Sequence, residues 1–444
     1  MRISIPTPGA KRHSNLTADS SSHEAEKSAV KPLTILHTSD WHLGRTLGKL
    51  KKRHEELKEF LDWLLSTIER EKVDVLLVAG DIFDTVAPAN EAQGLYYSFL
   101  SKVQGSSCNN IVITSGNHDS QSFLNAPKEL LKALSVHVVA EVTDNLEDEL
   151  VSLTDLSGEL ILIVAAVPFL KDRVLRLATE GESIEERDRK MALGVKEHYE
   201  KLAILSEKLK GDKKVPIVAM GHLFARGGIT HEGDGVRELY VGSLSRVDTA
   251  SFPKLFDYVA LGHLHSAQSA NKNNIRYSGS PIHMSFNEAG ENLKPKSVTL
   301  IKILNGELGI RELEIPVFQE LITIKGDMKK IKNRLTELKN SGSSAWIEII
   351  FDSDEAVGDL REIFDTHIKG SSLEILIIKN LRNYELALSN DDECKPLKEY
   401  TVMEVFDRVL DAQNVPENDR EELKKTFNEV MFLFNEKRAG SQSD

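Results

Sequence analysis

Cysteine is scarce in this sequence, with two residues in 444. Cys108 and Cys394 lie far apart and show no metal-ligand spacing, which excludes a disulfide framework and suits a reducing compartment. Long apolar runs are also missing. The longest uncharged apolar stretch, residues 160–170, contains a proline and is far too short to cross a bilayer, so we expect no transmembrane segment.

A targeting segment is absent from the start of the sequence. Residues 1–32 contain no apolar core followed by a cleavage-like site, so they do not have the pattern of a signal peptide. They are rich in serine, and we expect them to form a poorly ordered tail. The expected location is therefore the cytoplasm.

An excess of positive charge is absent as well. The formal net charge of −13 argues against indiscriminate binding of nucleic acid through the overall field. Any contact with DNA must be local, and one basic cluster is the candidate: Arg45, Lys49, Lys51, Lys52 and Arg53. The alternative is a solvated charge cluster that opens the next helix. Its position directly after Asp40 and His42, which can both bind metals, favours contact with a phosphate backbone.

What the sequence does contain is a repeated pattern, in which an apolar run is followed at once by metal-binding side chains. The clearest example, VDVLLVAGDIFD at residues 73–84, predicts a buried strand that ends in a carboxylate. Four further runs have the same form, at residues 33–40, 110–119, 216–222 and 258–265. Because open α/β sheets bind ligands at the carboxyl ends of their strands, we expect these endings to meet in one crevice.

Seven nitrogen and oxygen ligands, and no thiolate, stand at these strand ends: Asp40, His42, Asp81, Asn117, His222, His263 and His265. Each alone could be a core or turn residue, but packing does not explain the whole set. Seven ligands suit two ions that share a bridging carboxylate, for which Asp81 is the candidate. Mixed carboxylate, amide and imidazole ligands favour Mn²⁺, with Mg²⁺ as the alternative. Two ions about 3.5–4 Å apart can ionise a bridging water, which predicts phosphoester hydrolysis.

The order of the expected elements divides the chain into three parts after the tail. Residues 33–316 alternate strand and helix, which predicts an α/β domain with a helix near residues 124–134, a charged helical insertion at 171–214 and a hairpin that turns at Asn305 and Gly306. Residues 317–385 predict a β-α-β-α-β module without ligands, which suits a lid or docking element. Residues 394–438 predict two amphipathic helices.

The apolar faces of these last helices have two interpretations. They either pack back on the body of the protein or bind a partner helix. The candidate partner contacts are Val402, Phe406, Val409, Leu423, Phe427 and Val430.

The motifs Asp-Trp-His, Gly-Asp, Gly-Asn-His-Asp, Gly-His and Gly-His-Leu-His, in this order, resemble those of the calcineurin-like metallophosphoesterases. Within that superfamily, HTSDWHLGR, AGDIFDT, SGNHDS, ALGHLH and YSGSP are similar to the SbcD-type nuclease subunits of double-strand-break repair complexes. The resemblance covers nearly all of the chain except the tail. It implies a four-layer α-β-β-α sandwich with a small α+β capping domain and a C-terminal helical pair.

The resemblance also implies roles for the site residues. One metal would be held by Asp40, His42, Asp81 and His265, and the second by Asp81, Asn117, His222 and His263. His118 cannot serve the same ion as its neighbour Asn117 without strain, so it is left to contact the scissile phosphate and to assist the departing 3′ oxygen. Asp119 would orient the ring of His118.

For function, the resemblance implies a DNA repair and recombination nuclease. It would be a 3′–5′ exonuclease on double-stranded ends and an endonuclease on single strands and hairpins. Its partner would be an SbcC-type, SMC-like ABC ATPase gripped by the terminal helices, with a homodimer of this chain inside a heterotetramer. Two alternatives stay open, a cyclic-nucleotide or small phosphodiester hydrolase and a non-enzymatic scaffold for the ATPase. The segments after residue 316 argue against the first, and the seven intact ligands argue against the second.

Overall fold

The computed structural model describes residues 32–47, 51–176, 182–225, 247–290, 294–353 and 357–381, together with eight separate residues between 403 and 427. Residues 1–31 of the predicted tail lie outside the described residues, as do Lys49, Cys394, Val402, Val409 and Val430. None of the helices in the described part of the chain combines the length and the hydropathy of a membrane span.

The first sheet contains six strands in the order β14-β13-β1-β4-β5-β6. Its parallel part comprises β1 (Leu33–Thr38), β4 (Val75–Ala79), β5 (Asn110–Thr114) and β6 (Val136–Val139). β13 (Ser297–Leu304) and β14 (Glu307–Glu314) form an antiparallel hairpin at its edge. The turn at Asn305 and Gly306 has positive φ at both residues, as a two-residue hairpin requires, so the predicted hairpin is confirmed.

The second sheet also contains six strands, in the order β11-β12-β10-β9-β8-β7. Three strands that run parallel form its centre: β8 (Leu160–Ala166), β9 (Ile217–His222) and β10 (Tyr258–Gly262). β12 (Lys272–Tyr277) runs parallel to β10, and the outer strands β7 (Leu150–Thr154) and β11 (Gln268–Ala270) are antiparallel to their neighbours. The central strands of both sheets are buried along their length, which explains their continuous apolar sequences.

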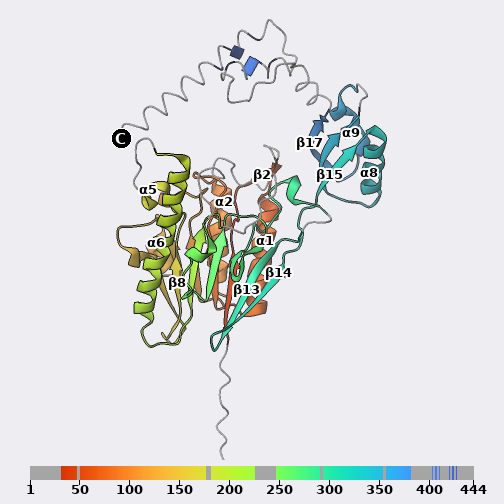
Figure 1. Ribbon diagram of the computed structural model, residues 1–444. Helices are drawn as coiled ribbons and strands as arrows, with labels where there is room; N and C mark the ends of the chain where they lie inside the picture. Colours follow the sequence, from red (N-terminus) through yellow and green to blue (C-terminus); the bar gives the residue numbers. More distant parts are fainter. Residues whose placement is uncertain are drawn as a thin grey trace, which may run out of the picture.

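The two sheets pack face to face, and helices cover both outer faces (Figure 1). Apolar side chains from both sheets, among them Leu77 and Val218, fill the space between them. α1 (His54–Glu71) and α2 (Asn90–Val103) cover the first sheet, and α6 (Ile184–Lys210) covers the second. The predicted four-layer α-β-β-α sandwich is therefore confirmed.

The region predicted as a charged helical insertion is a structural layer of the sandwich. It contains the short helix α5 (Asp172–Leu175) and the long helix α6. Ser183 and Glu186 form a reciprocal capping box at the start of α6, which satisfies two backbone N–H groups. α6 then buries four apolar side chains against the second sheet: Val195, Tyr199, Leu202 and Ala203. Charge on its outer face concealed this role in the sequence.

One predicted helix is interrupted. Where the spacing predicted a helix over residues 124–134, the chain forms two short helices, α3 (Gln121–Asn125) and α4 (Lys128–Lys132). Pro127 separates them, because proline has no N–H to donate within a continuous helix. Short 3₁₀ turns complete the domain: η1 (Leu146–Glu149), η2 (Thr249–Ser251) and η3 (Phe286–Glu288).

The second unit, which we call the cap, has the predicted β-α-β-α-β order. It comprises β15 (Leu321–Gly326), α8 (Met328–Asn340), β16 (Trp346–Phe351), α9 (Leu360–Ile368) and β17 (Glu374–Asn380). The three strands are parallel, and the apolar sides of both helices pack into one cluster with them, including Leu335, Phe351 and Phe364. Figure 1 shows the cap beside the end of the sandwich at which the small hairpin β2 (Thr46–Leu47) and β3 (Lys51–Lys52) lies.

The start of α1 contains a buried ion pair. The Arg53 side chain is fully buried, and its Nε and Nη2 atoms each donate to a carboxylate oxygen of Glu56 at 2.8 Å. The guanidinium also donates to the main-chain oxygen of His283, which ties α1 to the loop after β12. Removing one member of such a pair leaves an uncompensated charge in the interior.

We therefore expect Glu56→Ala to lower the free energy of unfolding by about 3–5 kcal/mol. The matched control is Asp62→Ala on the same helix, because Asp62 pairs with Lys58 at 3.1 Å and with Lys102 at 2.8 Å on an exposed surface, where such pairs contribute little. Urea denaturation followed by circular dichroism measures both. Equal losses in the two variants would contradict the assignment of Arg53 and Glu56 as a structural pair.

Candidate metal centre

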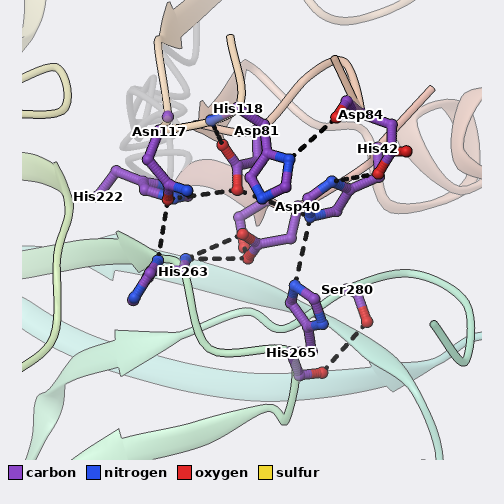
Figure 2. A network of polar contacts seen from close by, with 12 residues as sticks. Asp40, His42, Asp81, Asp84, Asn117, His118, His222, His263, His265 and Ser280 are labelled. Atoms are coloured by element: carbon purple, nitrogen blue, oxygen red, sulfur yellow. Dashed lines mark hydrogen bonds and ion pairs between the residues drawn. The ribbon is translucent and has the colours of Figure 1, made fainter. Parts of the chain in front are cut away.

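The candidate ligands lie close to one another (Figure 2). They follow the carboxyl ends of β1, β4 and β5 in the first sheet and of β9 and β10 in the second. Asn117 is half-buried. The other candidate ligands are buried: Asp40, His42, Asp81, His222, His263 and His265. The structure thus brings together side chains that are more than two hundred positions apart in the sequence, since His42 and His265 are separated by 223. All three groups of potential metal-binding residues among the described residues lie here.

Glycines allow the strand ends to approach one another this closely. A Cβ atom at Gly116 would lie 2.1 Å from Asp81 Oδ1, and one at Gly262 would lie 1.9 Å from the main-chain oxygen of Ala79. Neither space can hold a methyl group. The glycines that precede Asn117 and His263 are therefore a steric requirement of the site.

The backbone is strained at the ligands themselves. Four non-glycine ligands have positive φ: Asp40 at 53°, His42 at 47°, Asp81 at 51° and His263 at 105°. Hydrogen bonds between the loops hold this conformation, because the N–H groups of Asp40 and His42 donate to the oxygens of Gly80 and Asp81, both at 3.0 Å. Such strain is typical of functional sites, where the surrounding structure compensates for its cost.

The first group of ligands comprises Asp40, His42 and His265, whose donor atoms lie within 4.8 Å of one another. His42 Nε2 is 3.3 Å from His265 Nε2. In the second group, Asn117 Oδ1 lies 3.1 Å from His222 Nε2 and 3.1 Å from His263 Nδ1. Nitrogen and oxygen lone pairs that converge in this way suit a cation between them.

Asp81 lies between the two groups. Its Oδ2 atom is 3.6 Å from His42 Nε2 and 3.3 Å from His222 Nε2. One carboxylate oxygen that faces a histidine of each group has the geometry of a bridging ligand. The residues present therefore fit a pair of divalent cations, with ligand types that match oxygen- and imidazole-binding metals.

Burial sets the protonation of the histidines. It lowers the pKa of His42, and it lowers the pKa of His263 to about 3, so both rings are neutral as metal ligation requires. Burial also opposes protonation of His222, but the adjacent Asp81 carboxylate outweighs it and raises the pKa of His222 to about 9. A cation that binds there would replace this proton.

Known proteins share these motifs and segments. Residues 33–267 match the family model of the calcineurin-like phosphoesterases, and residues 317–414 match the model described as the type 5 capsule protein repressor C-terminal domain. The chain is 33% identical over 399 residues to the SbcD subunit of the nuclease SbcCD from Escherichia coli K12, covering 89% of this chain and 97% of the relative.

The chain belongs to the SbcD family of calcineurin-like phosphoesterases. It is a metal-dependent phosphodiesterase and a nuclease subunit. Two further relatives with the same name come from Rhodobacter capsulatus, 36% identical over 283 residues (62% of this chain, 67% of the relative), and Bacillus subtilis, 31% identical over 331 residues (71% and 78%).

The site of this chain also includes acidic residues that its sequence pattern did not indicate. Glu288 Oε1 lies 3.4 Å from His265 Nδ1, and Asp84 Oδ1 lies 3.3 Å from His42 Nδ1. His222 Nδ1 donates to the main-chain oxygen of Ala79 at 3.0 Å. In each histidine the contact occupies Nδ1 and leaves Nε2 to face the site. Asp84 stands three residues after Asp81 in the same motif, whereas Glu288 ends the short η3 turn and does not follow a strand directly.

The structure corrects the expected relation between His118 and Asp119. The Asp119 carboxylate accepts hydrogen bonds from the N–H groups of Gly116, Ile82 and Phe83, at 2.8, 3.1 and 2.9 Å. It therefore holds the two loops together and does not orient the ring of its neighbour. His118 Nδ1 instead lies 2.9 Å from the main-chain oxygen of Asp84, to which it donates.

The structure also corrects part of the predicted DNA-binding cluster. Arg53 is buried against Glu56, so the prediction of a DNA contact is wrong for this residue. Three other members form ion pairs: Arg45 with Asp84 at 2.9 Å, Lys51 with Glu374 at 2.7 Å and Lys52 with Glu91 at 2.9 Å. Contact of these three with DNA stays a prediction.

The predicted partner-binding residues are described only in part. Phe406 and Phe427 stack with their ring centroids 3.9 Å apart, and Lys424 pairs with Asp407 at 2.7 Å. The two stretches therefore pack against each other at these positions. Leu423 leaves 41% of its surface exposed.

If Asp81 bridges two ions, its substitution should affect both. We expect the wild-type chain to bind two Mn²⁺ ions, Asp81→Asn to bind neither at concentrations that saturate the wild type, and His265→Ala to lose one. Isothermal titration calorimetry gives the stoichiometry, and thermal unfolding checks that each variant is folded. An Asp81→Asn variant that retains one ion at wild-type affinity would remove Asp81 from the bridging role.

Proposed function

We propose that this chain is a dinuclear-metal DNA nuclease, with 3′–5′ exonuclease activity on double-stranded ends and endonuclease activity on single strands and hairpins. The observation that supports it best is the position of Asp81 Oδ2, 3.6 Å and 3.3 Å from a histidine nitrogen of each ligand group. Mn²⁺ is the proposed ion, with Mg²⁺ as the alternative, because carboxylate, amide and imidazole ligands suit these metals.

The proposed ligands are those implied by the family motifs. Asp40, His42, Asp81 and His265 would hold one ion, and Asp81, Asn117, His222 and His263 the other. When bound, the pair of ions supplies an ionised water and neutralises charge on the phosphoryl and leaving oxygens. The protein contributes the positions of the ligands and excludes bulk water by burying them.

His118 is the proposed proton donor to the departing 3′ oxygen. The main-chain N–H of His118 donates to Asp81 Oδ1 at 2.8 Å, which fixes the residue beside the bridging carboxylate. Its Nδ1–H is held by the oxygen of Asp84, so Nε2 is the nitrogen that faces a substrate. A proton on Nε2 can then pass to the leaving 3′ oxygen. The oxygen then departs as a hydroxyl, which is a better leaving group than an alkoxide.

An SbcC-type ABC ATPase is the proposed partner, with two copies of this chain in a heterotetramer. The relatives are named as one subunit of the SbcCD nuclease, which supports an assembly with a second kind of subunit. Residues 394–438 are the proposed docking segment, 33–316 the nuclease domain and 317–385 the capping domain. The proposed location of this nuclease is the cytoplasm.

Wild-type protein and His118→Gln, assayed on the same substrates, test the proposed activity. With Mn²⁺ we expect the wild type to degrade end-labelled duplex DNA from its 3′ ends and to cut hairpins, and chelator should abolish both activities. His118→Gln should still bind two ions but cleave about 10²–10⁴-fold more slowly, since that is the range for a general acid.

His137→Gln is the matched control, because His137 lies on β6 outside the ligand groups and its variant should cleave at the wild-type rate. Hydrolysis of a 5′-cyclic nucleotide without cleavage of DNA would favour a small phosphodiester hydrolase instead. No hydrolysis by a chain that still binds the ATPase would favour a scaffold.

The docking segment gives a separate prediction. Leu423→Asp should greatly reduce copurification with the SbcC-type ATPase, because it places a charge on an exposed apolar position of that segment. Leu156→Asp is the matched control, since Leu156 is 89% exposed at the turn between β7 and β8, at the opposite end of the strands from the metal centre. Full copurification of Leu423→Asp would contradict docking through this face.

A further inference from the structure

The η3 turn lies between the metal centre and the cap. Its last residue, Glu288, contacts His265 of the first ligand group through Oε1, 3.4 Å from Nδ1. Its first residue, Phe286, packs with Leu321 and Trp346 of the cap. Three consecutive residues thus join a candidate metal ligand to the neighbouring unit.

Glu288 and Lys296 hold both the side chain and the main chain of His265. Glu288 Oε2 accepts from Lys296 Nζ at 2.6 Å and from the N–H of Met284 at 3.0 Å. Lys296 Nζ also donates to the main-chain oxygen of His265 at 2.9 Å and to Ser280 Oγ at 2.8 Å. Glu288 is buried, so these contacts define one orientation of its carboxylate.

The cap side of the turn is a closed apolar contact. Phe286, Leu321, Trp346 and Leu47 of β2 are each less than 10% exposed and form one cluster. Lys51 of β3 reinforces it, because its Nζ lies 5.0 Å from the centre of the Trp346 ring and 2.7 Å from Glu374. The position of Phe286 therefore depends on the docked cap.

On the basis of the proposed dinuclear function, we propose that Glu288 is a positioning residue for the metal ligand His265, and that docking of the cap on Phe286 fixes Glu288 in place. A carboxylate that accepts the Nδ1–H of a histidine sets its tautomer, directs the Nε2 lone pair to the metal and raises its basicity. Because η3 is so short, a shift of Phe286 also shifts Glu288. Metal binding at the His265 group and the position of the cap are thereby coupled.

Titration of the full chain with Mn²⁺ tests the role of Glu288. Glu288→Ala should weaken binding of one of the two ions about 10–100-fold and leave the other unchanged. Glu288→Gln, which keeps the shape and one acceptor oxygen, should give an intermediate loss. Glu149→Ala is the matched control, because Glu149 is a buried acid that contacts His198 at 2.8 Å outside the ligand groups, and its variant should bind both ions normally.

A nuclease assay separates positioning from general loss of structure. In Glu288→Ala the Mn²⁺ concentration for half-maximal cleavage should rise by the same factor, while the rate at saturating Mn²⁺ returns close to that of the wild type. A folded Glu288→Ala variant with wild-type Mn²⁺ affinity would overturn the proposal. If the wild type itself binds fewer than two ions or leaves DNA intact, the proposed function fails instead.

The coupling between the cap and metal binding is tested by Phe286→Ala. This variant loses the side chain that contacts Leu321 and Trp346. Weaker binding of the same single ion is expected, with recovery in Phe286→Leu, which keeps an apolar side chain. Circular dichroism confirms the fold of each variant, and Phe286→Leu provides the comparison if Phe286→Ala does not fold. Unchanged affinity in a folded Phe286→Ala variant would refute the coupling.

Discussion

Hydrogen bonds between the two sheets at their carboxyl ends are the constraint on which this site depends. Asp40, which follows β1 of the first sheet, accepts the N–H of His263, which follows β10 of the second, at 2.9 Å. In the other direction, His222 of the second sheet contacts the oxygen of Ala79 in the first at 3.0 Å. These contacts fix the spacing between the sheets, so ligands from both can face the same ions.

This arrangement buries two carboxylates, which costs free energy of folding. Asp40 and Asp81 are at most 2% exposed, and burial of unpaired charge is costly. Asp40 is partly compensated by Ser39 Oγ, which donates at 2.6 Å, and Asp81 by the N–H of His118 at 2.8 Å. The proton that Asp81 favours on His222 adds positive charge, and divalent cations would supply more, so these buried carboxylates favour metal binding.

The convergence of these side chains at one end of the sandwich could be predicted because their pattern is local. Each follows a buried apolar run directly, as His222 does in PIVAMGH, and parallel strands bring such endings together. Glu288 could not be found in this way, since it does not follow a strand and its contact with His265 depends on where the η3 turn packs. Arg53 was misassigned for a related reason: a basic cluster looks the same in sequence whether its members face solvent or an internal carboxylate. α6 was recognised as a helix, but its charged face hid its place in the fold.

Attraction for a phosphodiester must come from local sources in this chain. The net charge of −13 repels DNA at long range, and the described members of the basic cluster already have acidic partners or lie buried. Lys51 is engaged by Glu374 and Trp346 in the contact between the sandwich and the cap. A pair of divalent cations at Asp81 would therefore act twice, as the source of the nucleophile and as the local positive charge that draws a phosphate into the crevice. Residues that position the His265 ring would then influence substrate binding as well as chemistry.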